Sequence, residues 1–259
     1  MHISEVSNKS IFAALIITLM GLGHTANAAV VLLSEFRSVS ANASVSTPVG
    51  SESASTSRNS LGEFSDFDEL VEVDLALANG SASGTAQQTS QISTTFISAA
   101  GATTSSVEVI AAIDPLTFTF AAANADTSLL VDFEVTTPQM FNLSGAVSLF
   151  NPSEMNGGIA SVSLRSQDGS LIFGTDIFDF QPTPLTIPFD QSGMLLPDIY
   201  TLSAGTVIGA SAFFATLESG TADFSLDFKV TAVPIPAAAW LFGSGLLGMI
   251  GVARRRKVA

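Results

Sequence analysis

The chain has 259 residues, a formal net charge of −14 at pH 7, and no cysteine. Its two histidines, His2 and His24, both lie before residue 29. From residue 29 onward, the composition therefore excludes a Ser-His-Asp triad, a Cys-His nucleophile pair, a zinc site of Cys or His, and disulfide cross-links.

The N-terminus has the pattern of a secretory signal. A short apolar run follows Lys9, and Ala26 and Ala28 supply the A-x-A pattern that signal peptidase cleaves. Because the run is shorter than the ~20 apolar residues of a membrane span, we interpret residues 1–28 as a signal peptide and Ala29 as the first exported residue. An uncleaved anchor is the alternative.

The exported segment, residues 29–233, is strongly acidic. It holds 22 of the 23 acidic residues and 4 of the 9 basic residues, so its charge is near −18. Nucleic acids and anionic lipid surfaces are bound through clustered Lys and Arg, so neither is an expected partner. About 205 residues are enough to bury a core without cross-links.

The first half of this segment mixes one clear strand pattern with polar tracts. Ala29 to Phe36 predicts a first strand, whereas Ser38 to Ser60 is rich in Ser, Ala, Asn and Thr. We expect a loosely packed segment at 38–60, because few large apolar residues recur in it; polar edge strands are the alternative. Val71 to Leu77 then alternates apolar and polar residues, and Asn79-Gly80 marks a turn.

The second half repeats the period-two alternation. Apolar residues alternate with polar ones from Leu129 to Val135 and from Phe224 to Val230. Asp168-Gly169 predicts a hairpin turn, and Pro182, Pro184 and Pro188 predict a loop. No amphipathic helix is expected between the two termini. The sequence therefore predicts an all-β domain, an antiparallel β-sandwich of jelly-roll or related type.

The densest acidic cluster offers a candidate metal site. Asp66, Asp68 and Asp74, with Glu69 and Glu72 between them, supply the oxygen ligands that Ca²⁺ prefers. We favour a solvent-exposed strand face over a metal site, because Asp66, Asp68, Glu72 and Asp74 would lie on one side of an extended strand. Two carboxylates also suffice for glycoside hydrolysis, although this segment has only one Tyr and no Trp to form a sugar-stacking platform.

The C-terminus predicts a membrane-spanning helix. Ile235 to Ala253 is a run of nineteen residues without a charge. As a helix it would be about 28 Å long, close to the ~30 Å thickness of a bilayer core. The basic cluster that follows, Arg254, Arg255, Arg256 and Lys257, is expected to stay in the cytoplasm, which places residues 29–233 on the other side of the membrane.

The tail as a whole, residues 234–257 with Val233 before it, resembles the PEP-CTERM sorting signal of Gram-negative bacteria. The resemblance rests on the proline motif Val233-Pro234-Ile235-Pro236, which is similar to the VPLPAA variant, on the apolar span, and on the terminal arginine cluster. It implies recognition and processing by an exosortase, and association with extracellular polysaccharide or biofilm.

These features lead to one main hypothesis and two alternatives. The main hypothesis is a non-enzymatic protein, held in the inner membrane before processing and at the cell surface or outside the cell afterwards. One alternative is a carbohydrate-binding or carbohydrate-cleaving module that uses carboxylates and Ca²⁺. The other is a periplasmic domain that stays anchored permanently. No other cofactor is expected.

Overall fold

The computed structural model describes residues 29–110, 119–152, 156–178, 181–213 and 216–233, together with residue 245. Within these ranges the chain forms twelve β-strands. They are β1 (Val30–Thr47), β2 (Gly50–Leu61), β3 (Phe67–Leu77), β4 (Gly80–Ile92), β5 (Phe96–Val109), β6 (Phe120–Val135), β7 (Gln139–Asn151), β8 (Gly158–Ser166), β9 (Leu171–Phe178), β10 (Gln181–Leu195), β11 (Asp198–Phe213) and β12 (Leu217–Ala232).

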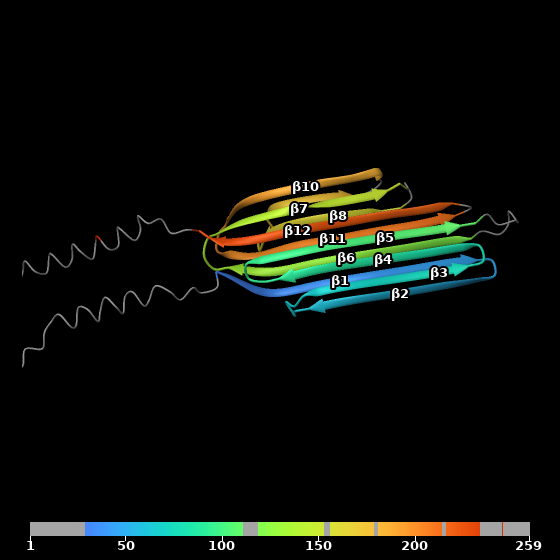
Figure 1. Ribbon diagram of the computed structural model, residues 1–259, viewed down its shortest axis with the longest axis horizontal. Helices are drawn as coiled ribbons and strands as arrows, with labels where there is room; N and C mark the ends of the chain where they lie inside the picture. Colours follow the sequence, from blue (N-terminus) through green and yellow to red (C-terminus); the bar gives the residue numbers. More distant parts are fainter. Residues whose placement is uncertain are drawn as a thin grey trace, which may run out of the picture.

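The strands form two six-stranded antiparallel sheets packed face to face (Figure 1). Sheet A has the order β2-β1-β6-β11-β8-β9, and sheet B has the order β10-β7-β12-β5-β4-β3. The prediction of an antiparallel β-sandwich is confirmed. The order differs from an eight-stranded jelly roll, because the described residues alone supply twelve strands.

The two ends of the sandwich domain lie together. Each strand reverses the direction of the one before it, so an even number of strands returns the chain to the end where it started. In Figure 1, β1 begins and β12 ends at the left of the sandwich. With 18 residues, β1 is about 60 Å long, so the opposite turns are far from both termini.

Both predicted terminal segments fall outside the described residues, apart from residue 245 in the tail. Among the residues that the structure describes, no helix has the length and apolar character needed to cross a membrane.

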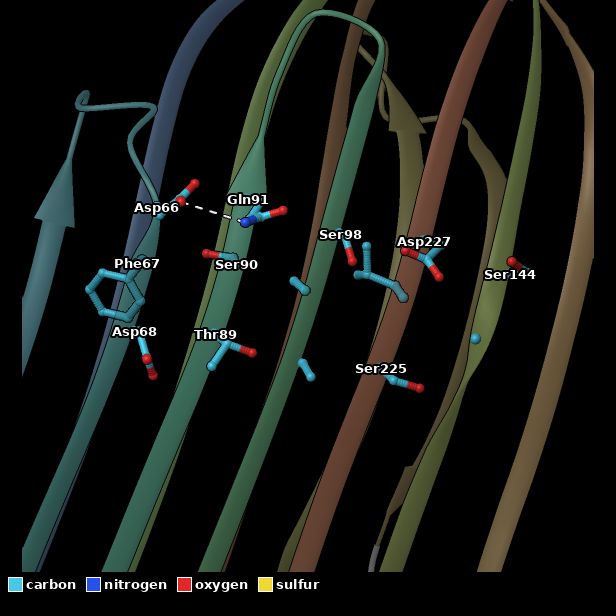
Figure 2. A pocket seen from close by; sticks show the side chains of 14 residues that line it. Asp66, Phe67, Asp68, Thr89, Ser90, Gln91, Ser98, Ser144, Ser225 and Asp227 are labelled. Carbon is cyan, nitrogen blue, oxygen red and sulfur yellow. Dashed lines mark hydrogen bonds between the residues drawn. The ribbon is translucent and has the colours of Figure 1, made fainter.

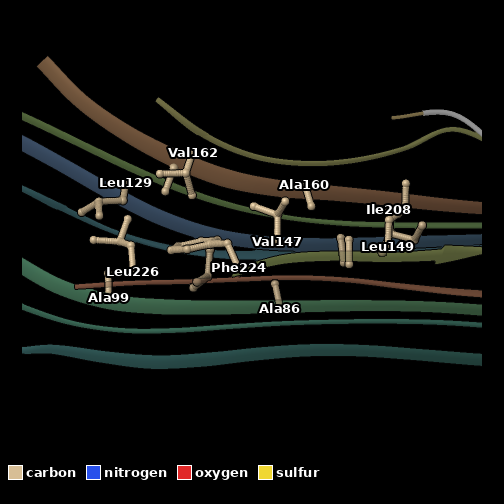
Figure 3. Packing of buried hydrophobic residues seen from close by; sticks show 14 of the residues in the cluster. Ala86, Ala99, Leu129, Val147, Leu149, Ala160, Val162, Ile208, Phe224 and Leu226 are labelled. Atoms are coloured by element: carbon tan, nitrogen blue, oxygen red, sulfur yellow. The ribbon is translucent and has the colours of Figure 1, made fainter. Parts of the chain in front are cut away.

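The core lies between the sheets, where alternate side chains of each strand point inward. The apolar series at Leu129–Val135 and Phe224–Val230 are buried, as their alternation predicts. Phe133 of β6 packs against Phe228 of β12 with the two rings tilted and their centroids 5.3 Å apart. Figure 3 shows Leu129 of sheet A close to Leu226 of sheet B in this layer.

The structure corrects the expectation of a loosely packed segment at residues 38–60, which form the second half of β1 and all of β2 except Leu61. Val39, Ala41, Ala43 and Val45 point inward and are buried, while serines and an asparagine alternate with them on the outer face. Alanine can fill this layer because the sheets approach closely. A Cβ on Gly84 of β4 would lie 3.0 Å from a backbone oxygen of the opposite sheet.

The three prolines expected in a loop lie instead on strand β10. This strand is the edge of sheet B and pairs only with β7. Proline cannot donate a backbone hydrogen bond, but an edge strand tolerates it because one side of its backbone has no partner strand.

The two predicted hairpin turns are confirmed. Asn79 separates β3 from β4, which pair antiparallel through Leu77 and Gly80. Asp168 and Gly169 lie in the turn between β8 and β9, where Gly169 has a φ of 84°. Glycine adopts this backbone conformation without the steric cost that a side chain adds.

Candidate functional site

A groove of about 530 Å³ crosses the outer face of sheet B (Figure 2). It runs over β3, β4, β5, β12 and β7, near the end of the sandwich that carries the termini. Among the described residues that line the groove there are three carboxylates and no Lys or Arg.

The floor of the groove consists of short side chains in two rows across the sheet. In one row, Ser98 of β5 lies between Asp227 of β12 and Gln91 of β4. In the next row, Ala100 lies between Ser225 and Thr89. Side chains of this size leave the face hollow, and their hydroxyl and amide groups can exchange hydrogen bonds with a bound polar molecule.

The carboxylates lie at two places in the groove, near β3 and on β12. Asp66 and Asp68 lie at β3, where Asp66 Oδ2 is 3.5 Å from Gln91 Nε2, and Asp227 stands on β12 (Figure 2). The strands β12 and β3 are three positions apart in sheet B, a separation of about 14 Å. The groove therefore carries carboxylate acceptors near β3 and on β12, with the short side chains of its floor between them.

A smaller hollow of about 310 Å³ adjoins this groove and shares Thr89 and Ala100 with it. Asp223 of β12 lies at its border. Although the residue is exposed overall, burial of its carboxyl group raises the pKa of Asp223. This carboxyl is therefore protonated more readily than an ordinary surface aspartate.

The predicted calcium ligands do not converge. Asp68 and Asp74 both lie on the exposed side of β3, but six residues apart, which is about 20 Å along a strand. The two cannot share one ion. Asp66 precedes the strand and belongs to the groove. Across the ranges described, no three His, Cys, Asp or Glu side chains are grouped to hold a metal ion.

Most predicted tail and signal residues lie outside the described residues. This holds for Ala26, Ala28, Pro234, Ile235 and Pro236, and for the basic cluster Arg254, Arg255, Arg256 and Lys257. Val233, the first residue of the proline motif, is described and is partly exposed directly after β12.

Sequence reasoning missed a buried ion pair at Glu35 and Arg37 of β1. Both side chains are fully buried, and Arg37 Nε lies 2.9 Å from Glu35 Oε2. Arg37 also donates to the backbone oxygen of Ser65 at 2.6 Å, and Glu35 accepts from Ser60 Oγ at 2.9 Å. The available signal was their spacing, because residues two apart in a strand share a face, here the inward one.

This pair secures the connection between the two sheets. Ser60 lies near the end of β2 and Ser65 lies in the crossover from β2 to β3, and both bond to the pair. The Arg37 guanidinium lies 5.1 Å from the ring centre of Phe67, the first residue of β3. Burial raises the pKa of Glu35, but hydrogen bonds from Arg37, the Glu63 N–H and Ser60 outweigh burial, so the net effect is a lowered pKa.

No family model and no curated protein matches this chain. Among solved structures, tailspike protein 4 of bacteriophage CBA120 is 11% identical, with a TM-score of 0.22, over 63% of this chain and 19% of the tailspike chain. The structure of infectious bursal disease virus, Gt strain, is 9% identical, with a TM-score of 0.23, over 76% of this chain and 70% of the viral chain. A carbohydrate-binding module of the β-sandwich superfamily is 10% identical, with a TM-score of 0.17, over 78% of this chain and 98% of the module.

The chain spans about a fifth of the tailspike structure. None of the three TM-scores reaches 0.5, so the fold and the groove described above rest on the geometry of this chain.

Proposed function

We propose that this chain is a non-enzymatic exported protein of the cell surface or extracellular matrix, sorted by an exosortase through its C-terminal tail. The observation that carries the proposal is the position of the last strand. Strand β12 is complete at Ala232, directly before the proline motif at Val233. Processing near this point would remove the tail and leave every described strand intact.

The order of events follows from the chain's two ends. Signal peptidase removes residues 1–28, and the apolar span at 235–253 holds the protein in the inner membrane with residues 29–233 in the periplasm. Processing then releases the acidic sandwich to the surface or the medium. The negative charge of the sandwich favours solubility and long-range repulsion between copies. The family resemblance implies that the sandwich associates with extracellular polysaccharide.

The composition supports a non-enzymatic role, because the exported segment contains no His or Cys for nucleophilic, acid–base or zinc-assisted catalysis.

The test is the intact mass of the protein made in a host with an exosortase and in the same host without it. With the enzyme, we expect a species that lacks residues beyond the proline motif; without it, we expect the tail to be retained in the inner membrane. A full-length membrane species in both hosts would contradict sorting and would favour the permanent anchor.

The groove supports a second candidate function, glycan binding. Its hydroxyl-bearing floor and its carboxylate acceptors suit the hydroxyl groups of a neutral sugar chain. Under this hypothesis the Asp68→Asn/Asp227→Asn variant loses most of its retention on glycan-coated beads. Asp74→Asn, which changes an exposed carboxylate of β3 outside the groove, should not.

The same panel tests calcium. Neutral and acidic glycans are compared in Ca²⁺ and in a chelator, and retention that requires Ca²⁺ would restore the calcium hypothesis. Equal, weak retention of all variants on every glycan would remove the glycan-binding function.

A further inference from the structure

The sandwich has four edge strands, and three of them carry features that discourage pairing with another chain. β10 carries three prolines, β3 carries four acidic residues, and β9 has only 8 residues. Prolines, edge charges and short length are common means of blocking edge-to-edge association. The fourth edge, β2, has 12 residues, no proline and no lysine.

Strand β2 is open along its length. It pairs only with β1, none of its residues is buried, and it forms the lower boundary of the sandwich in Figure 1. A large apolar residue is strongly exposed on each side of it: Val49, in the turn directly before β2, at 89%, and Leu61, the last residue of β2, at 74%. Its charged residues Glu52 and Arg58 have no ion-pair partner among the described residues.

The sequence of this edge is complementary to itself when two copies run antiparallel. If Ser55 lies opposite Ser55 of a second copy, Glu52 of each copy lies opposite Arg58 of the other. In the same register Val49 lies opposite Leu61, again twice. In this register the numbers of two opposed residues always sum to 110, as they do for 52 with 58 and for 49 with 61. Any shift of the register changes this sum, so both the charge match and the apolar match are lost.

We propose that β2 is a self-association edge, at which a second copy of this chain adds its own β2 antiparallel and centred on Ser55. The backbone groups of the two edges form the ladder, and the paired charges and apolar residues fix the register. On the outer face of sheet A, Leu61 lies beside Phe36 of β1, which lies beside Leu130 of β6, and all three are exposed. Val49 of the second copy extends this apolar row.

Antiparallel pairing turns the second copy end for end, so the termini of the two copies lie at opposite ends of the dimer. Two copies anchored by their tails in one membrane have their termini on the same side and cannot pair in this way. We therefore expect dimerisation only after the tail has been processed. This order of events rests on the proposed function, whereas the pairing of the two β2 strands does not.

Cysteine cross-linking tests the register, since the native chain has no cysteine. In the released protein, oxidised Ser55→Cys is expected to give a disulfide-linked dimer, because directly opposed residues lie within disulfide reach. Ser57→Cys, on the same face, is the control. In this register residue 57 lies opposite residue 53 of the second copy, so the two introduced cysteines are four positions apart, about 13 Å along the strands, and cannot form a disulfide. Equal cross-linking of the two variants, or none in either, would overturn the proposal.

Charge exchange tests the pairing independently. Glu52→Arg alone is expected to weaken dimerisation by about tenfold in sedimentation experiments, because it places like charges opposite each other twice. Glu52→Arg with Arg58→Glu is expected to restore the native affinity. A double variant as weak as the single one would contradict the pairing.

The Ser55→Cys experiment also separates the pairing from the sorting. It is run on released protein and on membrane-held protein from a host without exosortase. Cross-linking of the released form alone supports both claims. Cross-linking of both forms supports the pairing and overturns the anchored arrangement.

Discussion

Arg37→Ala is expected to lower the free energy of unfolding by about 3–5 kcal/mol, because it leaves the Glu35 carboxylate buried without its counter-charge. It also removes the donor to the Ser65 carbonyl at the crossover between the sheets. Urea unfolding at neutral pH measures the effect. Arg165→Ala is the control, since Arg165 is exposed and should change stability by no more than about 0.5 kcal/mol. Equal stability of the two variants would contradict a structural role for the pair.

The same pair predicts a direction for the pH dependence. The folded-state pKa of Glu35 lies below its ordinary value of 4.5, so its ionised form stabilises the fold fully above that value. The contribution is lost as the pH falls through the folded-state pKa. Glu35→Gln should therefore be less stable than the native protein at neutral pH, with the difference narrowing in acid.

Ending the chain before β12 is expected to abolish folding, whereas ending it at Val233 is expected to change the free energy of unfolding by about 0.5 kcal/mol or less. The reason is that β12 lies in the interior of sheet B, paired with both β5 and β7. Its inward residues Phe224, Leu226 and Phe228 are buried in the core. Thermal unfolding followed by circular dichroism compares chains that end after residue 216 and after residue 233.

A folded chain without β12 would contradict the assignment of this strand to the core. A large loss of stability on ending at Val233 would contradict the proposal that the tail can be removed without cost to the sandwich.

Strands with large apolar residues could be predicted from the sequence. At Val131, Phe133 and Val135 the period of two alone indicates which side chains are buried, and the Asn79-Gly80 and Asp168-Gly169 turns fix two hairpins. These are local properties of the chain, so no knowledge of the opposite sheet is needed.

The remaining features depend on partners distant in the sequence. The inward side chains of Ala41 and Ala43 are buried because β4 of the opposite sheet approaches β1 closely, which a search for large apolar residues does not detect. The groove requires the register of five strands, since Asp68 and Asp227 are far apart in the chain. The spacing of Glu35 and Arg37, two residues apart in a strand, predicts that they share one face. Their burial depends on the crossover between β2 and β3, which covers them.

The measurement that tests the central claim most directly is intact mass combined with cell fractionation in a host that has an exosortase. The native chain is compared with a variant in which Arg254, Arg255, Arg256 and Lys257 are replaced by alanine. A control, Arg165→Ala/Lys229→Ala, removes positive charge outside the tail. We predict a tail-free surface or released species from the native chain and the control, and none from the tail variant. The same full-length inner-membrane species from all three would contradict the sorting function.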